Sequence, residues 1–188
     1  MIRVRQGDGA AFAQLYDRHA RSVVNFAHRF VQDRARAEEL AQEIFLKLHR
    51  GAASYEPRAR FKTFLFRIAA NHCLNERRRG EWRHEQATEP EAMRHNPAPQ
   101  GEGPNEKLVG RELERALGEA LSELPARERA AFSMARFEGM AYREIAEALD
   151  ASEAAVKSLI HRATVAVAKA LEPVLGENPL AAKRARSL

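Results

Sequence analysis

The stretch FEGMAYREIAEALDASEAAVKSLIHR, residues 137–162, carries the strongest local pattern in the chain. Its apolar spacing predicts a short helix over residues 142–149, a turn, and a longer helix that begins at residue 153. Ala146 is small where the two helices would cross, and Ser152 can cap the second helix. The remaining core positions are apolar: Ile145, Leu149, Val156 and Ile160. This is the spacing of a helix-turn-helix.

The second helix of this motif would present one polar and basic face to a DNA major groove. The residues on that face are Glu153, Ala154, Lys157, Ser158, His161 and Arg162. A generic helical hairpin is the alternative, but the small residue, the cap, the turn and the basic second helix coincide here. Binding to duplex DNA is therefore favoured.

The composition is that of a folded protein with an anionic partner. The 188 residues are 45% hydrophobic and 30% charged, with a formal net charge of +5. Charges interrupt each apolar run before it is long enough for a membrane span. No signal peptide follows the first basic residues, so we expect a cytoplasmic protein. The single cysteine, Cys73, cannot form an internal disulfide or a thiolate zinc site.

The chain divides at a stretch rich in proline and glycine, residues 85–105, which has no apolar periodicity. Residues 1–84 carry 17 Lys and Arg against 9 Asp and Glu, whereas residues 106–153 are acidic and 154–188 basic. We predict an all-α protein of two small helical domains, 1–84 and 106–172, joined by a flexible linker. Residues 173–188 form a C-terminal tail.

The N-terminal segment carries two further surface patterns. A helix that ends at Gly51 sets an apolar stripe against an acidic and polar face that includes Glu38, Gln42 and Glu43. That face is either simply solvated or a binding surface. Between residues 58 and 83, basic side chains are interleaved with aromatic rings, a combination that suits single-stranded nucleic acid. Packing of these rings in the core is the alternative for each ring taken singly.

Taken in order, these motifs resemble the extracytoplasmic-function (ECF) group of the sigma-70 family of bacterial sigma factors. The likeness spans nearly all of residues 7–172. The motifs that carry it are RAEELAQEIF at 36–45, FKTFLFRIAAN at 61–71, RRR at 77–79, LSELP at 121–125, FEGMAYREIA at 137–146 and VKS at 156–158. Because these motifs occur together, in the family's order and spacing, they are highly specific for this family.

The resemblance implies a role for each surface. Glu38, Gln42 and Glu43 would dock on the clamp helices of core RNA polymerase. The loop around Tyr55 would capture an unpaired base of the minus-10 non-template strand, and the helix-turn-helix would read the minus-35 element. The implied minus-10 residues are Ser54, Tyr55, Arg58, Arg60, Lys62, Phe64, Arg67, Asn71, Asn75, Arg77 and Arg78.

Further expectations follow from the same resemblance. The partners would be core polymerase, promoter DNA and an anti-sigma factor, with no cofactor, no small-molecule substrate and no catalysis by this chain. Phe64 stands where the family commonly has Trp, and Ala155 and Leu159 stand where it has Thr and Arg. These departures predict a weaker or unusual minus-35 interaction, and greater dependence on minus-10 contacts.

Three other function classes are weighed against this one. A conventional helix-turn-helix regulator would need a dimer interface or a ligand pocket, for which the N-terminal segment shows no pattern. An enzyme would need a nucleophile, metal or phosphate motif, and His84 is followed by Thr88 where a zincin needs a second histidine. An RNA-binding helical protein leaves the duplex-reading motif unexplained.

Overall fold

Every regular element of the computed structural model is a helix, over the residues that the structure describes: 1–57, 60–84 and 104–177. This confirms the prediction of an all-α chain. Of the predicted linker, residues 85–103 lie outside the described residues, and so does the tail from residue 178. The linker prediction extends two residues too far, because a helix already begins at Pro104.

The N-terminal segment contains five elements. They are α1 (Ile2–Arg5), α2 (Gly9–Val31), α3 (Arg34–Arg50), the short 3-10 turn η1 (Gly51–Ser54) and α4 (Phe61–His84). The carboxylate of Asp8 caps α2 by accepting a hydrogen bond from the backbone N–H of Ala11 at 2.9 Å. Asp33 caps α3 in the same way, through the N–H of Arg36 at 2.8 Å. Each cap satisfies a backbone donor that has no partner within its helix.

The C-terminal segment contains four helices: α5 (Pro104–Glu123), α6 (Ala126–Arg136), α7 (Tyr142–Leu149) and α8 (Glu153–Glu177). The bounds of α7 and the start of α8 are those predicted from the sequence. Asp150 ends α7 in the left-handed conformation, with φ of 49°. Ser152 Oγ then accepts the N–H of Ala155 at 3.1 Å, as expected for the cap of α8.

Proline and glycine mark the two ends of α6. Pro125 precedes the helix as its N-cap. At the other end of α6, Gly139 has φ of 60° and the N–H of Met140 bonds to the carbonyl of Met134 at 3.1 Å. This is a left-handed glycine termination, and the helix itself stops at Arg136.

Helix α8 also continues past the expected end, because Pro173 lies inside it. Proline lacks the N–H that would bond to the carbonyl of Lys169, four residues earlier. Both residues are exposed, so water can hydrate that carbonyl and the final turn survives.

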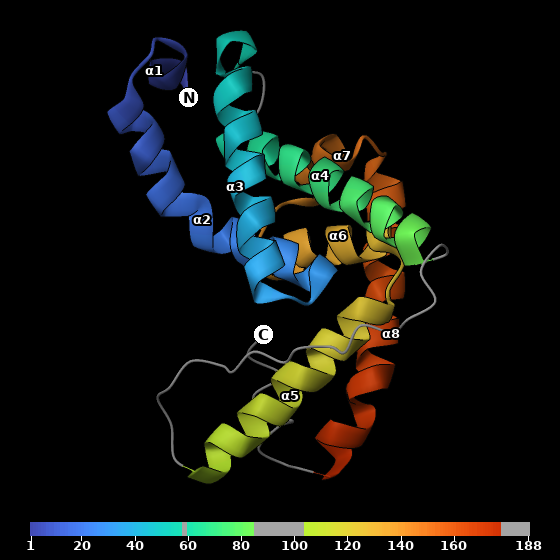
Figure 1. Ribbon diagram of the computed structural model, residues 1–188. Helices are drawn as coiled ribbons and strands as arrows, with labels where there is room; N and C mark the ends of the chain where they lie inside the picture. Colours follow the sequence, from blue (N-terminus) through green and yellow to red (C-terminus); the bar gives the residue numbers. More distant parts are fainter. Residues whose placement is uncertain (58–59, 85–103, 178–188) are drawn as a thin grey trace.

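The two segments pack directly on one another. Helix α4 lies beside α7 and also touches α6, while α2 meets α5 and α6 (Figure 1). One hydrophobic core runs from Phe26, Ile44 and Phe66 in the first segment to Met134 and Ile145 in the second. The sequence predicts two tethered domains and gives no sign of this shared core.

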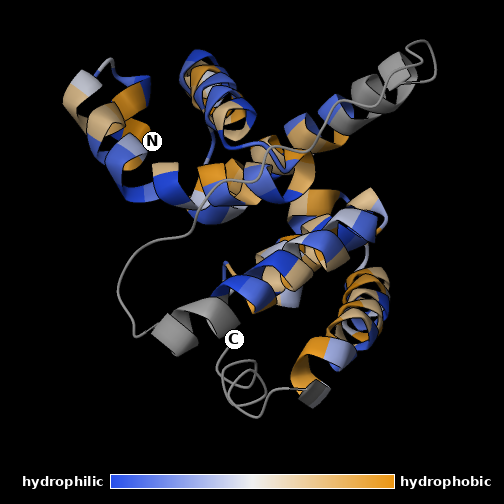
Figure 2. Ribbon diagram, turned by 60° about the horizontal axis from the view of Figure 1, so that its bottom comes forward, coloured by the Kyte–Doolittle hydropathy of each residue, from blue (hydrophilic) through white to orange (hydrophobic). Residues whose placement is uncertain are grey.

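A second core lies between α5 and α8, which extend together away from the other helices (Figure 1). It is built from Leu113, Leu121, Phe132, Val167 and Leu171. Hydrophilic and hydrophobic residues alternate in bands along the helices, as expected when each helix buries one face (Figure 2). None of the helices over the described residues is long and apolar enough to cross a membrane.

Candidate nucleic-acid interface

Helix α8 presents the predicted duplex-reading face to solvent. Ala154, Lys157, Ser158 and His161 occupy positions i, i+3, i+4 and i+7, so they share one side of the helix. All six predicted residues are exposed, including Glu153 and Arg162. The opposite side is buried, which leaves this face available to a groove.

Two residues of α8 qualify that picture. Leu159, where the family commonly has Arg, is half-buried and packs against the main core, so its side chain helps to hold the helix in place. Arg162 forms an ion pair with Glu128 of α6 at 2.6 Å. The guanidinium of Arg162 therefore already has a carboxylate partner within the C-terminal segment.

Helix α4 carries a second polar stripe. Arg67, Asn71 and Asn75 are exposed and spaced by four residues, so they form one line along the helix. Arg77 and Arg78 lie further along α4, but their side chains fall outside the described residues, as does that of Ser54. Arg58 lies outside them altogether.

Aromatic packing leads from this stripe to the loop before α4. The ring of Phe64 meets that of Tyr55 edge to face at 5.0 Å, and the guanidinium of Arg67 lies 5.3 Å from the Phe64 centroid. The structure thus brings together three of the predicted minus-10 residues. Tyr55 is buried, however, so its ring is held in the protein and does not project from the loop.

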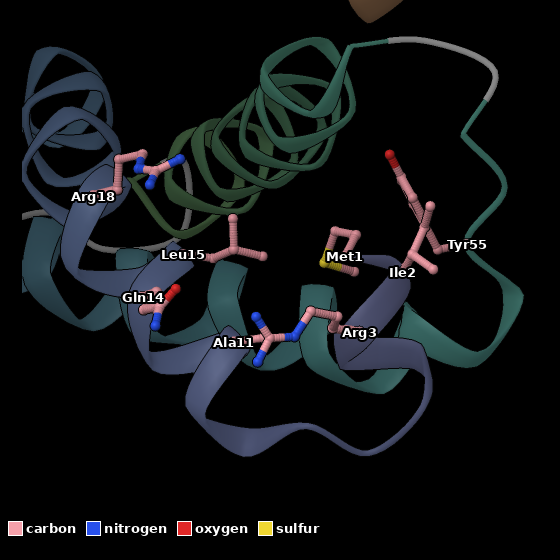
Figure 3. Close-up of a pocket in the computed structure, with 8 residues that line it drawn as sticks. All are labelled: Met1, Ile2, Arg3, Ala11, Gln14, Leu15, Arg18 and Tyr55. Carbon is pink, nitrogen blue, oxygen red and sulfur yellow. The ribbon is translucent and has the colours of Figure 1, made fainter.

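A cavity of about 360 Å³ opens beside Tyr55, between α1, α2 and the loop (Figure 3). Its lining combines apolar side chains with two guanidinium groups and one amide. The lining residues are Met1, Ile2, Arg3, Ala11, Gln14, Leu15, Arg18 and Tyr55. Apolar walls with a few polar groups are typical of sites that hold a small organic group, although this hollow is shallow and open to solvent.

Arg60 and Lys62 are engaged by the C-terminal segment. Lys62 Nζ lies 3.3 Å from Glu138 Oε2 and also donates a hydrogen bond to the Glu138 carbonyl. Arg60 Nη1 lies 3.3 Å from Glu144 Oε1, at the start of α7. These two predicted DNA contacts therefore have carboxylate partners within the chain.

The predicted acidic face lies on α3. Glu38 and Gln42 are exposed, whereas Glu43 is half-buried. Glu43 Oε2 lies 2.8 Å from His72 Nε2, and Lys47 Nζ lies 2.6 Å from His72 Nδ1. An ammonium group can only donate, so Nδ1 is the acceptor and the Nε2–H of His72 donates to Glu43. The orientation of Glu43 is thus fixed by α4.

Arg36 extends this network. Its guanidinium bonds to Glu39 at 2.8 Å and to Glu76 of α4 at 2.6 Å, and these bonds raise its pKa above the ordinary value. Cys73 lies behind the network, where burial raises the pKa of its thiol to about 12. The Cys73 thiol is therefore protonated and packed in the hydrophobic core.

The α3 face contains two more exposed residues. Glu39 and Leu46 lie three residues before Gln42 and four after it, on the same side of the helix. The sequence pattern places Glu39 on this face, without a contact role, and Leu46 was missed; its side chain is 53% exposed. Helical spacing counted forward from Gln42 would have included Leu46.

The described residues offer no site for a metal ion, since nowhere among them do three His, Cys, Asp or Glu side chains come together suitably. What the geometry provides is surfaces: two polar and basic faces, on α4 and α8, and an acidic face on α3. Such surfaces bind macromolecules.

Comparison with known proteins agrees with this arrangement. Residues 15–83 match the family model for Sigma-70 region 2, and residues 114–166 match that for Sigma-70, region 4. The chain is 32% identical to the RNA polymerase sigma-H factor of Pseudomonas aeruginosa, covering 93% of each protein. It is 34% identical to the RNA polymerase sigma factor CarQ of Myxococcus xanthus, covering 98% of this chain and all of CarQ.

The fold is also that of a solved sigma factor, RpoE of Bartonella quintana, whose crystal contains the anti-sigma factor NepR. The TM-score is 0.71 at 21% identity, over 86% of this chain and 97% of RpoE. With both family regions present in order and full-length relatives above 30% identity, the chain belongs to the ECF group of the sigma-70 family of RNA polymerase sigma factors.

Proposed function

We propose that this chain binds core RNA polymerase through the exposed face of α3 and directs it to promoters through α4 and α8. The observation that carries the proposal is the presence of three separate surfaces on one small chain. An acidic face suits a protein partner, a polar stripe with nearby rings suits an unpaired strand, and a helix-turn-helix suits a duplex. A conventional regulator would need only the last.

The domain assignment follows from these surfaces. Residues 1–84 would bind polymerase and open the minus-10 element, and residues 106–172 would read the minus-35 element. The family models match within these limits. Polymerase supplies the chemistry of RNA synthesis, and this chain supplies the choice of start site.

At the minus-10 element, the free energy of strand opening must be recovered from contacts with the unpaired strand. Unstacking and unpairing a base costs a few kcal/mol. The cavity beside Tyr55 offers apolar walls for a base, with Arg3 and Arg18 for the adjoining phosphates. Arg67, Asn71 and Asn75 would then follow the strand along α4.

At the minus-35 element, α8 would enter the major groove with Lys157, Ser158 and His161 toward the bases and phosphates. Ala155 adds no polar group there, and Leu159 is committed to the core. We therefore expect few base contacts and a promoter that depends mainly on its minus-10 element. Equal loss of transcription on scrambling either element would contradict this.

An anti-sigma factor is the expected regulator, because the similar RpoE of Bartonella quintana was co-crystallised with the anti-sigma factor NepR. CnrH, which is also similar in fold, was solved in complex with the cytosolic domain of CnrY. The site of action would be the bacterial cytoplasm, on the nucleoid once polymerase is bound.

Transcription of a fragmented genomic library by bacterial core polymerase, with and without this protein, tests the proposal. Sequencing of new 5′ ends should reveal discrete starts that share two upstream elements. Substitution of Lys157 by Ala should weaken these starts, whereas Lys169→Ala, an exposed lysine later on α8, should not. Failure to bind core polymerase at all would refute the proposal.

A further inference from the structure

Helices α3 and α4 lie against one another, and a buried histidine joins them beside the face proposed to bind polymerase (Figure 1). His72 of α4 is 7% exposed and has a charged partner at each of its ring nitrogens. Its Nε2 lies 2.8 Å from Glu43 Oε2, and its Nδ1 lies 2.6 Å from Lys47 Nζ. The imidazole therefore stands between a carboxylate and an ammonium group that both belong to α3.

The spacing of these two partners along α3 would allow them to pair with each other. Glu43 and Lys47 are four residues apart, with the carboxylate nearer the start of the helix, which is the favoured order for an ion pair on one helix. Within the described residues, however, no direct ion pair joins them. Each side chain turns instead to a ring nitrogen of His72. The ring thus separates two charges that would otherwise partly neutralise one another.

One protonation state of the ring satisfies both contacts. A carboxylate can only accept a hydrogen bond and an ammonium group can only donate one, so the ring proton is on Nε2 and Nδ1 carries a lone pair. The other neutral tautomer, or a doubly protonated ring, would set an N–H against the ammonium group of Lys47. The bridge therefore requires an uncharged His72 with its proton on Nε2.

The other acidic residues of this face are held differently. Glu38 pairs with Arg34 and Glu39 with Arg36, in each case at 2.8 Å and with both partners on α3 and partly exposed. Water screens pairs of this kind, and their long side chains rearrange at little cost. Glu43 differs because its nearest partner is a buried ring of α4. Its own side chain remains 44% exposed, so part of the carboxylate is still open to a binding partner.

We infer that His72 is a positioning residue for polymerase binding, which holds the Glu43 carboxylate in one orientation and keeps Lys47 from pairing with it. The inference rests on the proposed function of the α3 face. It adds to that face a residue of α4 that does not itself touch the partner.

Two effects on affinity follow from this role. A glutamate whose side chain is already fixed loses less conformational entropy on docking than a free one does. A carboxylate that is kept apart from the neighbouring ammonium group also presents more negative charge to a basic surface on the partner. Both effects are lost when the ring is replaced by a side chain that cannot donate to Glu43.

Two amide substitutions separate the halves of the bridge. The amide of His72→Gln reaches to the position of Nε2, so it can still donate to Glu43 and accept from Lys47. The shorter amide of His72→Asn keeps an acceptor near the position of Nδ1 but leaves Glu43 without its donor. His19→Asn is the matched control, because the ring of His19 is half-buried, meets the ring of Phe61 at 5.2 Å and takes no part in the bridge. Urea titration checks that each variant is folded.

Competition for core polymerase against a labelled parent chain measures the effect. His72→Asn should bind about fivefold more weakly than the parent chain, which corresponds to about 1 kcal/mol. His72→Gln and His19→Asn should stay within about twofold of the parent chain. When Glu43→Ala is already present, His72→Asn should cause no further loss, because the carboxylate that it orients is gone.

Three results of this competition are decisive. Equal binding by His72→Asn and the parent chain would overturn the inference. So would an undiminished loss in the Glu43→Ala background, because it would show that His72 acts on the fold in general and not through Glu43. A parent chain that does not bind core polymerase would refute the proposed function itself, and the inference with it.

Nuclear magnetic resonance of the full parent chain tests the bridge without polymerase and without a substitution in the measured protein. Long-range proton–nitrogen spectra distinguish a protonated ring nitrogen from an unprotonated one, and the His72 signals are those missing from His72→Gln. We expect a proton on Nε2 alone in neutral buffer. A proton on Nδ1 would overturn the inference while leaving the proposed function untouched.

Discussion

Leu46 provides a quantitative test of the polymerase-binding face. It lies on the exposed side of α3, four residues from Gln42, and 53% of it is open to solvent. Binding energy in protein interfaces is concentrated at a few side chains that lose all contact with water in the complex, and an exposed apolar side chain gains from that burial. We predict that Leu46→Ala weakens the affinity for core polymerase without unfolding the chain, since about half of the residue is open to solvent and alanine favours a helix.

The size of the effect follows from the exposed fraction. Full burial of a leucine side chain stabilises by about 1.5–3 kcal/mol, and roughly half of that remains available to Leu46 on docking. The loss on truncation is therefore about 1 kcal/mol, which corresponds to about fivefold in the dissociation constant. Leu46→Asp should weaken binding further, because a carboxylate would lose hydration in the interface.

The assay is competition for core polymerase against a fluorescently labelled parent chain. Val165→Ala is the matched control, because Val165 is 55% exposed on α8, away from the α3 face. Glu39→Ala, on the same face, should also weaken binding. If Leu46→Ala competes as well as Val165→Ala does, the assignment of this face to polymerase is wrong.

Three further predictions concern the described contacts. Ser152→Ala removes the cap of α8 and should lower the free energy of unfolding, measured by urea titration, by about 1 kcal/mol. Ser158→Ala is the control, because the Ser158 hydroxyl donates to the carbonyl of Ala154 within α8, and it should leave the free energy of unfolding unchanged. Equal urea midpoints for the two variants would contradict the role of Ser152 as a cap. Arg129→Met removes the guanidinium that donates to the carbonyls of Ser122 and Leu124, and should lower the free energy of unfolding by about 2–3 kcal/mol in the same titration. A decrease of less than about 0.5 kcal/mol would argue against a stabilising role for these hydrogen bonds. Burial raises the pKa of the Cys73 thiol to about 12, so the thiol stays protonated at pH 8. Iodoacetamide should therefore modify Cys73 only after the chain unfolds. Rapid modification of the folded chain would contradict the burial of this thiol in the core.

Local features of the fold could be predicted from the sequence. The cap at Ser152 and the ends of α7 depend on residues within one helical turn of each other. Such short-range features can be predicted from the sequence, because helix geometry fixes which neighbouring backbone groups a capping side chain can reach.

Contacts between distant residues could not be predicted in this way. Lys62 and Glu138 are 76 residues apart, and an amphipathic pattern tells which face is buried without telling what buries it. Arg129 is the clearest case. In the sequence it sits among Arg and Glu residues that suggest a solvated helix, yet in the fold it is almost wholly buried between two helix ends.

For the same reason, the sequence predicts the exposed positions on single helices of the candidate site, but not the surroundings of its loop residues. Positions on a single helix, such as Asn71 and Asn75 or Lys157 and His161, lie on the faces expected from their spacing. Tyr55 lies in a loop, and its burial against Phe64 depends on tertiary packing that no periodicity encodes. The pairing of Arg60 with α7 is likewise a property of the whole chain.

Helix α4 is covered by α2 and α3 from one segment and by α6 and α7 from the other. Separation of the two segments would therefore expose Ile145 and its apolar neighbours, the kind of surface that aggregates and that proteases engage. How often the segments separate would then set the lifetime of the free protein in a cell.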